Sequence, residues 1–431
     1  MTKVITYGTY DLLHYGHIKL LERAKALGDY LIVGVTADDF DKTRGKINVQ
    51  QSLMERVAGV QATGLADEVI IEEYEGQKID DIQKYAVDVF AIGSDWEGHF
   101  DYLNDYCRVI YLPRTEGISS SIIRSHDREI VLGVYGDGIV TEKFIEECKY
   151  VNGVRTLSAN SDFQVFVEKV DAVYIYSHPA NYYKYITYAL EHKKHVLCEM
   201  PLTQNAKQAH ELFELAEKKG CVLSLACKTA YSTAYNRMLL LVKGGIIGDV
   251  VSIDSTCTSI RTVNFADNHQ VIGCVSSLND WGPTAMLPVF QLLGVDYGKK
   301  EIISRIANEE YKYDEFTKCN FVYPSACASI SVGKGVKSEG CLIISGTKGY
   351  IYVPAPWWKT DYFEVRYENA ENNRRFFYQL EGEGTRYEIV AFVKSIQNKK
   401  MPSVSKEIGI AISQIMEDFL NEKDVTKLMK K

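Results

Sequence analysis

The sequence lacks several features that would place the protein in a specialised class. Its ten cysteines form no CxxC pair and no zinc-finger spacing, and no apolar segment precedes the first predicted strand, so we expect a reduced, cytoplasmic protein. No apolar run is long enough to cross a bilayer. The net charge of −8 argues against a nucleic-acid partner, although a local basic pocket could still bind a mononucleotide.

The length predicts more than one domain. A chain of 431 residues exceeds what a single hydrophobic core usually serves, and a hydrophobic content of 46% is enough for several packed cores. We therefore expect a globular protein with at least two domains and no extensive disorder.

The stretch Gly8–His17, reading GTYDLLHYGH, carries the strongest local signal. It follows an apolar strand at Val4–Tyr7 and opens a helix whose apolar positions recur between Ile18 and Leu27. A helix N-terminus presents backbone N–H groups and a positive dipole to an anion, and His14 and His17 lie three residues apart where this helix begins. The pattern indicates a phosphate site. The alternative is that one histidine caps the helix and the other packs.

Three ordered motifs resemble one family. GTYDLLHYGH resembles the HxGH signature of the nucleotidyltransferase superfamily, and the run from Val4 to Val35 is similar to glycerol-3-phosphate cytidylyltransferases. RTEGISSS, residues 114–121, resembles the motif that separates cytidylyl- from adenylyltransferases, and DWEG, residues 95–98, matches the glycerol-phosphate branch. The resemblance covers about residues 1–126 and implies a Rossmann-like α/β domain.

The same resemblance implies an activity and its residues. The reaction would transfer CMP from CTP, accompanied by Mg²⁺, to a glycerol phosphate and release pyrophosphate. The implied catalytic residues are His14, His17, Lys46 and Arg114. Nucleotide contacts are implied for Gly8, Thr9, Tyr10, His14, His17, Asp95, Arg114, Thr115, Gly117, Ile118, Ser119 and Ser120. Substrate contacts are implied for Asp11, Asp38, Arg44, Lys46 and Arg56.

Two of these assignments have plain alternatives. From composition alone, the charged loop that contains Arg44 and Lys46 could be a solvent-exposed segment without a binding role. An exposed arginine on a helix, as Arg56 is predicted to be, is usually solvated too. The acceptor also stays open, because glycerol-3-phosphate, glycerol-2-phosphate and other polyol phosphates meet the same anion-binding groups. The resemblance favours glycerol-3-phosphate, with CDP-glycerol feeding a teichoic-acid or capsular polymer.

A second resemblance begins after a polar seam near residue 128. A strand at Ile130–Tyr135 enters a partial dinucleotide-binding pattern, in which Gly136 and Gly138 fill the first two glycine positions and Thr141 takes the third. Residues 195–220 resemble the region around the EKP motif of the Gfo/Idh/MocA oxidoreductases, and residues 346–358 resemble that family's C-terminal sheet. The implied domains are 1–128, an abbreviated Rossmann-like domain at 129–235, and an α+β domain with a large, mostly antiparallel sheet at 236–431.

The catalytic positions of that second family are changed. The EKP motif reads Glu199-Met200-Pro201, and in the segment that begins at Asp280 the usual histidine is Thr284. No clear acid ends the second strand, where the ribose hydroxyls of a dinucleotide are normally held. We expect this half to lack NAD(P) and to act as a scaffold that makes a homodimer or higher homo-oligomer. The alternative is a bifunctional enzyme whose second half reduces a keto precursor with NAD(P)H.

Overall fold

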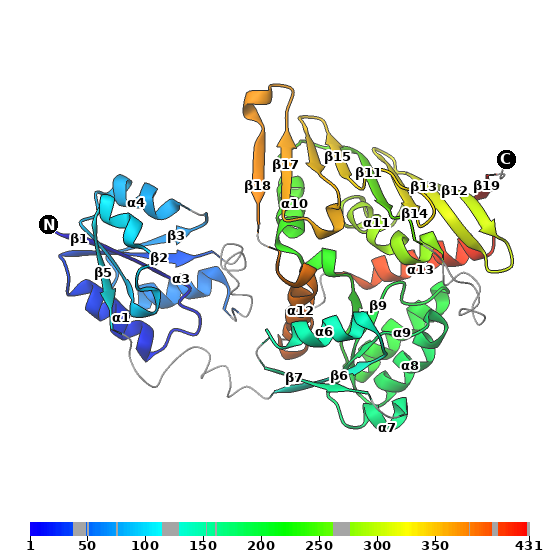
Figure 1. Ribbon diagram of the computed structural model, residues 1–431, viewed down its shortest axis with the longest axis horizontal. Helices are drawn as coiled ribbons and strands as arrows, with labels where there is room; N and C mark the ends of the chain where they lie inside the picture. Colours follow the sequence, from blue (N-terminus) through cyan, green and yellow to red (C-terminus); the bar gives the residue numbers. More distant parts are fainter. Residues whose placement is uncertain are drawn as a thin grey trace. The chain divides into compact units, whose positions relative to one another are not determined.

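The computed structural model divides the chain into two compact units, Met1–Glu129 and Ile130–Lys431 (Figure 1). The structure describes residues 1–37, 49, 51–74, 76–113, 129–151, 153–159, 162–261, 276–378, 380–398 and 404–428. The nine cysteines within these ranges are all free thiols. None of the helices in the described ranges is long and apolar enough to cross a membrane.

The first unit is built on a five-stranded parallel sheet in the order β3-β2-β1-β4-β5. Its strands are β1 (Lys3–Gly8), β2 (Tyr30–Thr36), β3 (Glu68–Glu72), β4 (Val89–Gly93) and β5 (Arg108–Leu112). The helices α1 (Tyr15–Lys25) and α3 (Leu53–Ala62) pack on one face, where Leu21 and Val60 join the core of the sheet. The helix α4 (Gln77–Tyr85) packs Ile82 against the other face.

This strand order creates a position for ligand binding at the carboxyl end of β1. The chain runs from β1 outward to β2 and β3, and then crosses to β4 and β5 on the other side. Loops leaving β1 and β4 therefore diverge at the carboxyl end of the sheet, which is where open α/β sheets bind ligands. The loop after β1 is the Gly8–His14 turn, and the loop after β4 begins the short helix η1 (Ser94–Trp96).

The second unit begins with another five-stranded parallel sheet, in the order β10-β9-β8-β6-β7. The strands are β6 (Ile130–Tyr135), β7 (Val154–Ser158), β8 (Ala172–Ile175), β9 (His195–Glu199) and β10 (Leu223–Ala226). The helices between them are α6 (Ile139–Cys148), α7 (Phe163–Val167), α8 (Pro179–Glu191) and α9 (Ala206–Lys219). The predicted strand at Ile130–Tyr135 is confirmed with the same bounds.

A large mixed sheet follows, in the order β18-β17-β16-β15-β11-β14-β13-β12-β19. Its strands are β11 (Val250–Thr258), β12 (Lys299–Asn308), β13 (Tyr313–Val322), β14 (Cys327–Gly333), β15 (Leu342–Gly346), β16 (Tyr350–Val353), β17 (Tyr362–Arg366), β18 (Arg374–Phe377) and β19 (Val425–Lys427). The remaining helices are α10 (Thr233–Lys243), α11 (Ser277–Leu293), α12 (Thr385–Asn398) and α13 (Lys406–Leu420). Except for the parallel pairs β11–β14 and β12–β19, neighbouring strands are antiparallel, so the predicted fold class is confirmed.

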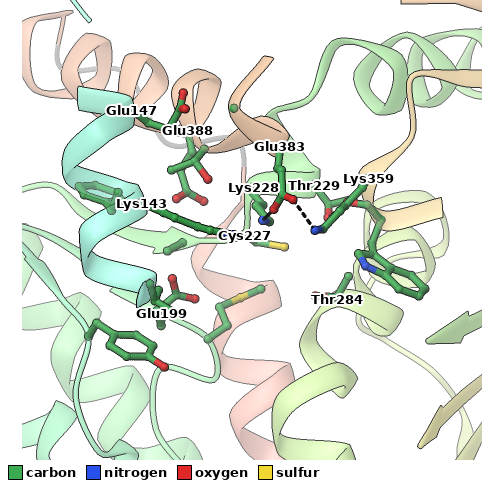
Figure 2. A pocket seen from close by; sticks show the side chains of 18 of the residues that line it. Lys143, Glu147, Glu199, Cys227, Lys228, Thr229, Thr284, Lys359, Glu383 and Glu388 are labelled. Atoms are coloured by element: carbon green, nitrogen blue, oxygen red, sulfur yellow. Dashed lines mark hydrogen bonds and ion pairs between the residues drawn. The ribbon is translucent and has the colours of Figure 1, made fainter. Parts of the chain in front are cut away.

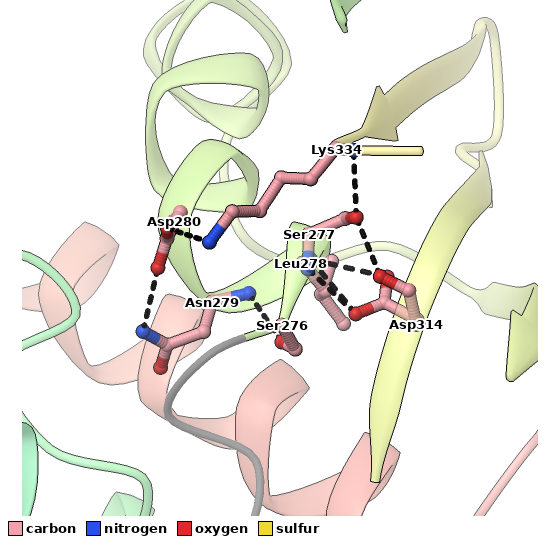
Figure 3. Close-up of polar contacts among 7 residues, drawn as sticks. All are labelled: Ser276, Ser277, Leu278, Asn279, Asp280, Asp314 and Lys334. Atoms are coloured by element: carbon pink, nitrogen blue, oxygen red, sulfur yellow. Dashed lines mark hydrogen bonds and ion pairs between the residues drawn. The ribbon is translucent and has the colours of Figure 1, made fainter. Parts of the chain in front are cut away.

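The long helix α11 is fixed to the sheet through its first turn (Figure 3). Asp314 of β13 is fully buried and accepts hydrogen bonds from the backbone N–H groups of Ser277, at 2.7 Å, and Leu278, at 3.2 Å. The Ser277 hydroxyl donates to the Asp314 carbonyl and accepts from the backbone N–H of Lys334. These bonds satisfy N–H groups that a helix end leaves unpaired. They fix the helix that carries Asp280 and Thr284.

Candidate functional site

In the first unit, the turn between β1 and α1 has an unusual backbone. Tyr10 and Leu12 have φ values of 53° and 48°, in the left-handed region that side chains other than glycine rarely adopt. Tyr10 is 1% exposed, and a Cβ atom on Gly8 would lie only 3.0 Å from its ring. The turn therefore depends on a small residue at position 8 and on burial of Tyr10. Backbone strain of this kind gathers at functional sites.

The two histidines of this turn lie together. His14 is the N-cap of α1, and its Nδ1 accepts a hydrogen bond of 3.1 Å from the backbone N–H of Gly16. The His14 and His17 rings stack with centroids 3.9 Å apart, and the His17 ring meets the Tyr10 ring edge-on at 5.5 Å. The helix begins at Tyr15 rather than near Ile18, because His14 provides the cap. Both predicted histidines thus share one helix N-terminus, and the cap-and-pack geometry of the alternative is present as well.

Arg56 links the Gly8–His14 turn to the rest of the first unit through hydrogen bonds. Its side chain is 1% exposed, so it is not the exposed helical arginine that was predicted from the sequence. Its Nη1 donates to the Thr9 carbonyl at 2.7 Å and to the Thr36 carbonyl at 2.8 Å, and its Nε donates to the Gln51 carbonyl at 3.3 Å. These contacts hold the segments that follow β1 and β2 together. A substrate contact by Arg56 stays a prediction.

Asp11 has a similar anchoring role in the described structure. It is 3% exposed, and its Oδ1 accepts a hydrogen bond of 2.9 Å from the backbone N–H of Gln51, whose own side chain accepts from Leu12. Asp95 lies in η1, at the carboxyl end of β4, with an exposed side chain. Asp95 and the Gly8–His14 turn therefore both lie at the carboxyl end of the sheet. Contacts of Asp11 and Asp95 with ligands remain predictions.

Nine predicted residues lie outside the described ranges, and their roles stay predictions. They are Asp38, Arg44, Lys46, Arg114, Thr115, Gly117, Ile118, Ser119 and Ser120.

A buried polar network that the sequence did not predict lies at the carboxyl end of the same sheet. Glu72, the last residue of β3, is fully buried, accepts a hydrogen bond of 2.9 Å from Thr36 and pairs with Lys78 of α4. The Tyr7 hydroxyl donates to Asp81 of α4 at 2.8 Å. Burial, followed by the nearby Asp81 carboxylate, raises the pKa of Tyr7. These residues have no motif, and nothing in their spacing indicates that three strands and a helix bring them together.

In the second unit, the changed redox positions line a cavity of about 650 Å³. Glu199, Met200, Asp280 and Thr284 all border it, whereas Gly136 and Gly138 form the turn before α6. The cavity therefore gathers four of the residues predicted as a degenerate redox site, and that assignment stays a prediction. Other chemistry-bearing residues also line it, from elements far apart in the sequence: Lys143, Cys227, Lys228, Lys359, Glu383 and Glu388 (Figure 2).

Two lysines in the cavity share one carboxylate. Lys228 and Lys359 contact the two oxygens of Glu383 at 2.9 and 2.7 Å. The hydrogen bonds from Lys228 and Lys359 lower the pKa of Glu383 to about 2. Glu383 holds a φ of 53° between Gly382 and Gly384, which also have positive φ, so this carboxylate is presented by a strained turn.

Two further carboxylates, Glu199 and Glu388, line the cavity and form no ion pair within the described residues. Glu199 accepts a hydrogen bond of 2.6 Å from Tyr174, and Glu388, which is 3% exposed, accepts from the backbone N–H of Cys227. Burial raises the pKa of both carboxyl groups, and the charge of Glu199 adds to the shift at Glu388. Pro201 follows Met200 in a cis peptide, just beyond β9.

The residues around α6 fit a dinucleotide only in part. A Cβ atom on Gly136 would lie 2.1 Å from the Tyr176 carbonyl, so close packing requires this glycine, and Gly138 begins α6 without a side-chain cap. Thr141, in place of the third glycine, donates to the Gly138 carbonyl. Asp162 accepts from the backbone N–H of Gln164 and so caps α7. Within the described residues, Asp162 is the first carboxylate after β7, and one of its two oxygens makes this cap.

Comparisons with known proteins separate the two units. A family described as cytidylyltransferase-like matches residues 5–126, and an oxidoreductase family with an NAD-binding Rossmann fold matches residues 122–227. Glycerol-3-phosphate cytidylyltransferases from Bacillus spizizenii and Bacillus subtilis are 56% and 53% identical over 124 residues, which is 29% of this chain and 95% of each relative.

A solved 3-ketoreductase from Actinomadura kijaniata, in complex with NADP and TDP-benzene, superposes with a TM-score of 0.61 at 15% identity. The match covers 70% of this chain and all of that one, and it shows a shared fold. The chain therefore belongs, through its first unit, to the glycerol-3-phosphate cytidylyltransferase family, and it carries a second unit with the fold of the Gfo/Idh/MocA oxidoreductases.

Proposed function

We propose that the first unit transfers CMP from CTP to a glycerol phosphate, giving CDP-glycerol and pyrophosphate for a cell-surface polymer. The observation that carries this proposal is the pair of stacked imidazoles, His14 and His17. They lie at a helix N-terminus at the carboxyl end of the sheet. The 56% identity to a glycerol-3-phosphate cytidylyltransferase supports the substrate class.

The chemistry needs positioning and positive charge more than a strong base. The attacking phosphate monoester is already an anion near neutral pH, so the barrier lies in bringing two anions together and stabilising charge on the α-phosphate. Nδ1 of His14 accepts from Gly16, so in the neutral ring Nε2 carries the proton and acts as a donor. We assign the same task to His17, Lys46 and Arg114. Mg²⁺ bound to CTP would neutralise the triphosphate.

We expect a strong preference for CTP over ATP, because RTEGISSS is the cytidylyl form of its loop. The experiment follows pyrophosphate release with each nucleotide against a panel of acceptors: glycerol-3-phosphate, glycerol-2-phosphate, phosphocholine and a longer polyol phosphate. CTP with glycerol-3-phosphate should be the fastest combination. Equal rates with CTP and ATP would contradict the nucleotide assignment, and absence of turnover with every glycerol phosphate would contradict the acceptor assignment.

For the second unit, we propose that the usual lysine-dependent hydride transfer is lost. Met200 and Thr284 replace the proton-transfer groups, and Asp162 caps α7. In this proposal the unit supplies surfaces for a homo-oligomer, in a reduced cytoplasmic setting. The competing candidate is reduction of a keto precursor by NAD(P)H, which the oxidoreductase fold favours.

Isothermal titration of the full chain with NAD(H) and NADP(H) tests this choice. We expect no binding heat and no oxidation of NADPH with keto-polyols. We also expect that Met200→Lys creates no dehydrogenase, because one lysine leaves Thr284 and the ribose position unchanged. Tight dinucleotide binding together with turnover in the unmodified chain would establish the competing candidate instead.

A further inference from the structure

The backbone of the Gly8–His14 turn is strained at Leu12. Its φ of 48° lies in the left-handed region, which destabilises a leucine and persists only where the surrounding structure holds it. Leu12 stands two residues before His14, which is the N-cap of α1. A change of the Leu12 backbone to a negative φ would therefore redirect the chain that leads into His14.

Gln51 forms two hydrogen bonds with this part of the turn. Its side-chain Oε1 accepts from the backbone N–H of Leu12 at 2.8 Å, and its own backbone N–H donates to Oδ1 of Asp11 at 2.9 Å. The partners are consecutive residues of the turn, and they lie 39 and 40 positions from Gln51 in the sequence. Two bonds to adjacent residues fix the orientation of the turn as well as its position.

The side chain of Gln51 provides the part of this link that depends on residue type. The backbone N–H that donates to Asp11 is present with any side chain except proline. The carbonyl of Gln51 also accepts from Nε of Arg56 at 3.3 Å, and Ser52, the next residue, caps α3. A substitution at position 51 therefore leaves its backbone anchored and removes the acceptor of the Leu12 N–H.

We propose that Gln51 is a positioning residue for cytidylyl transfer, because its side chain holds Leu12 in the left-handed conformation and thereby places the His14 ring. The inference rests on the proposed transfer of CMP, and Gln51 acts through the turn, without contact with the substrate. The His14 ring stacks on His17 at 3.9 Å, so a displaced His14 also disturbs its neighbour. Displacement of a catalytic group by about 1 Å can lower a rate by about 10²-fold.

Gln51→Met tests the hydrogen bond, because methionine has a similar length and lacks the amide oxygen. Pyrophosphate release from CTP with glycerol-3-phosphate should show kcat lowered about tenfold or more, with the KM of each substrate changed by less than about threefold. Gln61→Met is the matched control, since Gln61 of α3 is exposed and its side chain forms no hydrogen bond within the described part of the chain. Its kcat should equal that of the unmodified chain.

A double-mutant cycle separates positioning from a general loss of stability. If Gln51 acts through His14, the His14→Asn chain has already lost the group that Gln51 places. Adding Gln51→Met to that chain should then lower kcat by less than about twofold. A further loss as large as the one in the unmodified background would overturn the proposal, and so would an unchanged kcat in Gln51→Met alone.

The ring position can also be measured without turnover. In the full chain with ¹³C-labelled histidine, the Cε1–Hε1 NMR signals of His14 and His17, assigned with His14→Asn and His17→Asn, should shift in Gln51→Met. They should stay in place in Gln61→Met. The Tyr10 ring lies 5.5 Å from the His17 ring, so its ring current makes the signals sensitive to small displacements.

Unshifted histidine signals in Gln51→Met would overturn the proposal. If Gln51→Met does not fold, Gln51→Asn replaces it in every measurement, because its amide is one methylene too short to reach Leu12. Absence of CMP transfer by the unmodified chain would instead contradict the proposed function, and the histidine signals would still decide whether Gln51 places the rings.

Discussion

Replacing His14 or His17 by alanine is expected to lower the turnover of CMP transfer by roughly 10²–10³-fold while both units stay folded. The two rings stack at 3.9 Å over the start of α1, so each provides a donor next to the dipole of the same helix. Loss of one donor removes stabilisation of charge in the transition state. Turnover of CTP with glycerol-3-phosphate, measured by pyrophosphate release, gives the effect.

Asparagine at position 14 separates catalysis from capping. Alanine at this position also removes the hydrogen bond from Gly16, which costs about 1 kcal/mol of stability when an N-cap is lost. Asparagine is a good N-cap, so His14→Asn should melt like the unmodified chain and still lose turnover. An active His14→Asn variant would mean that the histidine serves only as a cap.

Replacing Arg56 by alanine is expected to destabilise the first unit by about 3 kcal/mol or more, since each buried carbonyl left unpaired costs about 1–3 kcal/mol. Arg56 contacts three carbonyls and is 1% exposed. A domain is stable by only about 5–15 kcal/mol, so much of the margin would be lost. Differential scanning calorimetry of the full chain, with and without CTP, identifies the transition of the first unit as the one that CTP shifts.

Arg56→Lys provides the matched control. Lysine keeps the charge, but its single ammonium lacks the planar fork that reaches several acceptors, so only part of the stability should return. If Arg56→Ala melted normally and instead raised the KM for glycerol-3-phosphate, Arg56 would be the substrate contact that the family resemblance implies.

Much of the fold could be predicted because its signals are local. The strand Ile130–Tyr135 has the predicted bounds, since an apolar run that ends at a glycine turn is readable without tertiary information. The start of α1 was less predictable. Tyr15 and Gly16 interrupt the apolar repeat, and the helix begins with them because His14 satisfies the N–H of Gly16.

The sites were predictable only where a motif marks them. GTYDLLHYGH indicated the histidine turn, and Met200 and Thr284 stand at readable positions of their motif. The resemblance singled out Arg56 as a substrate contact, but its buried position was not indicated, because its partners are carbonyls of three separate segments. Glu388 and Lys228 were missed for a related reason: they reach the cavity from α12 and from the end of β10, far along the chain from Glu199.

The contacts of Arg56 also bear on which substitutions the first unit can accept. Every hydrogen bond described for its guanidinium goes to a main-chain carbonyl, and a carbonyl is present whatever side chain stands at Thr9, Thr36 or Gln51. Substitutions at those three positions can therefore leave the hydrogen bonds of Arg56 intact, whereas few substitutions of Arg56 itself would preserve them. Substrate specificity could thus change by substitution of Thr9, within the Gly8–His14 turn, without loss of the Arg56 hydrogen bonds that hold the turn in place.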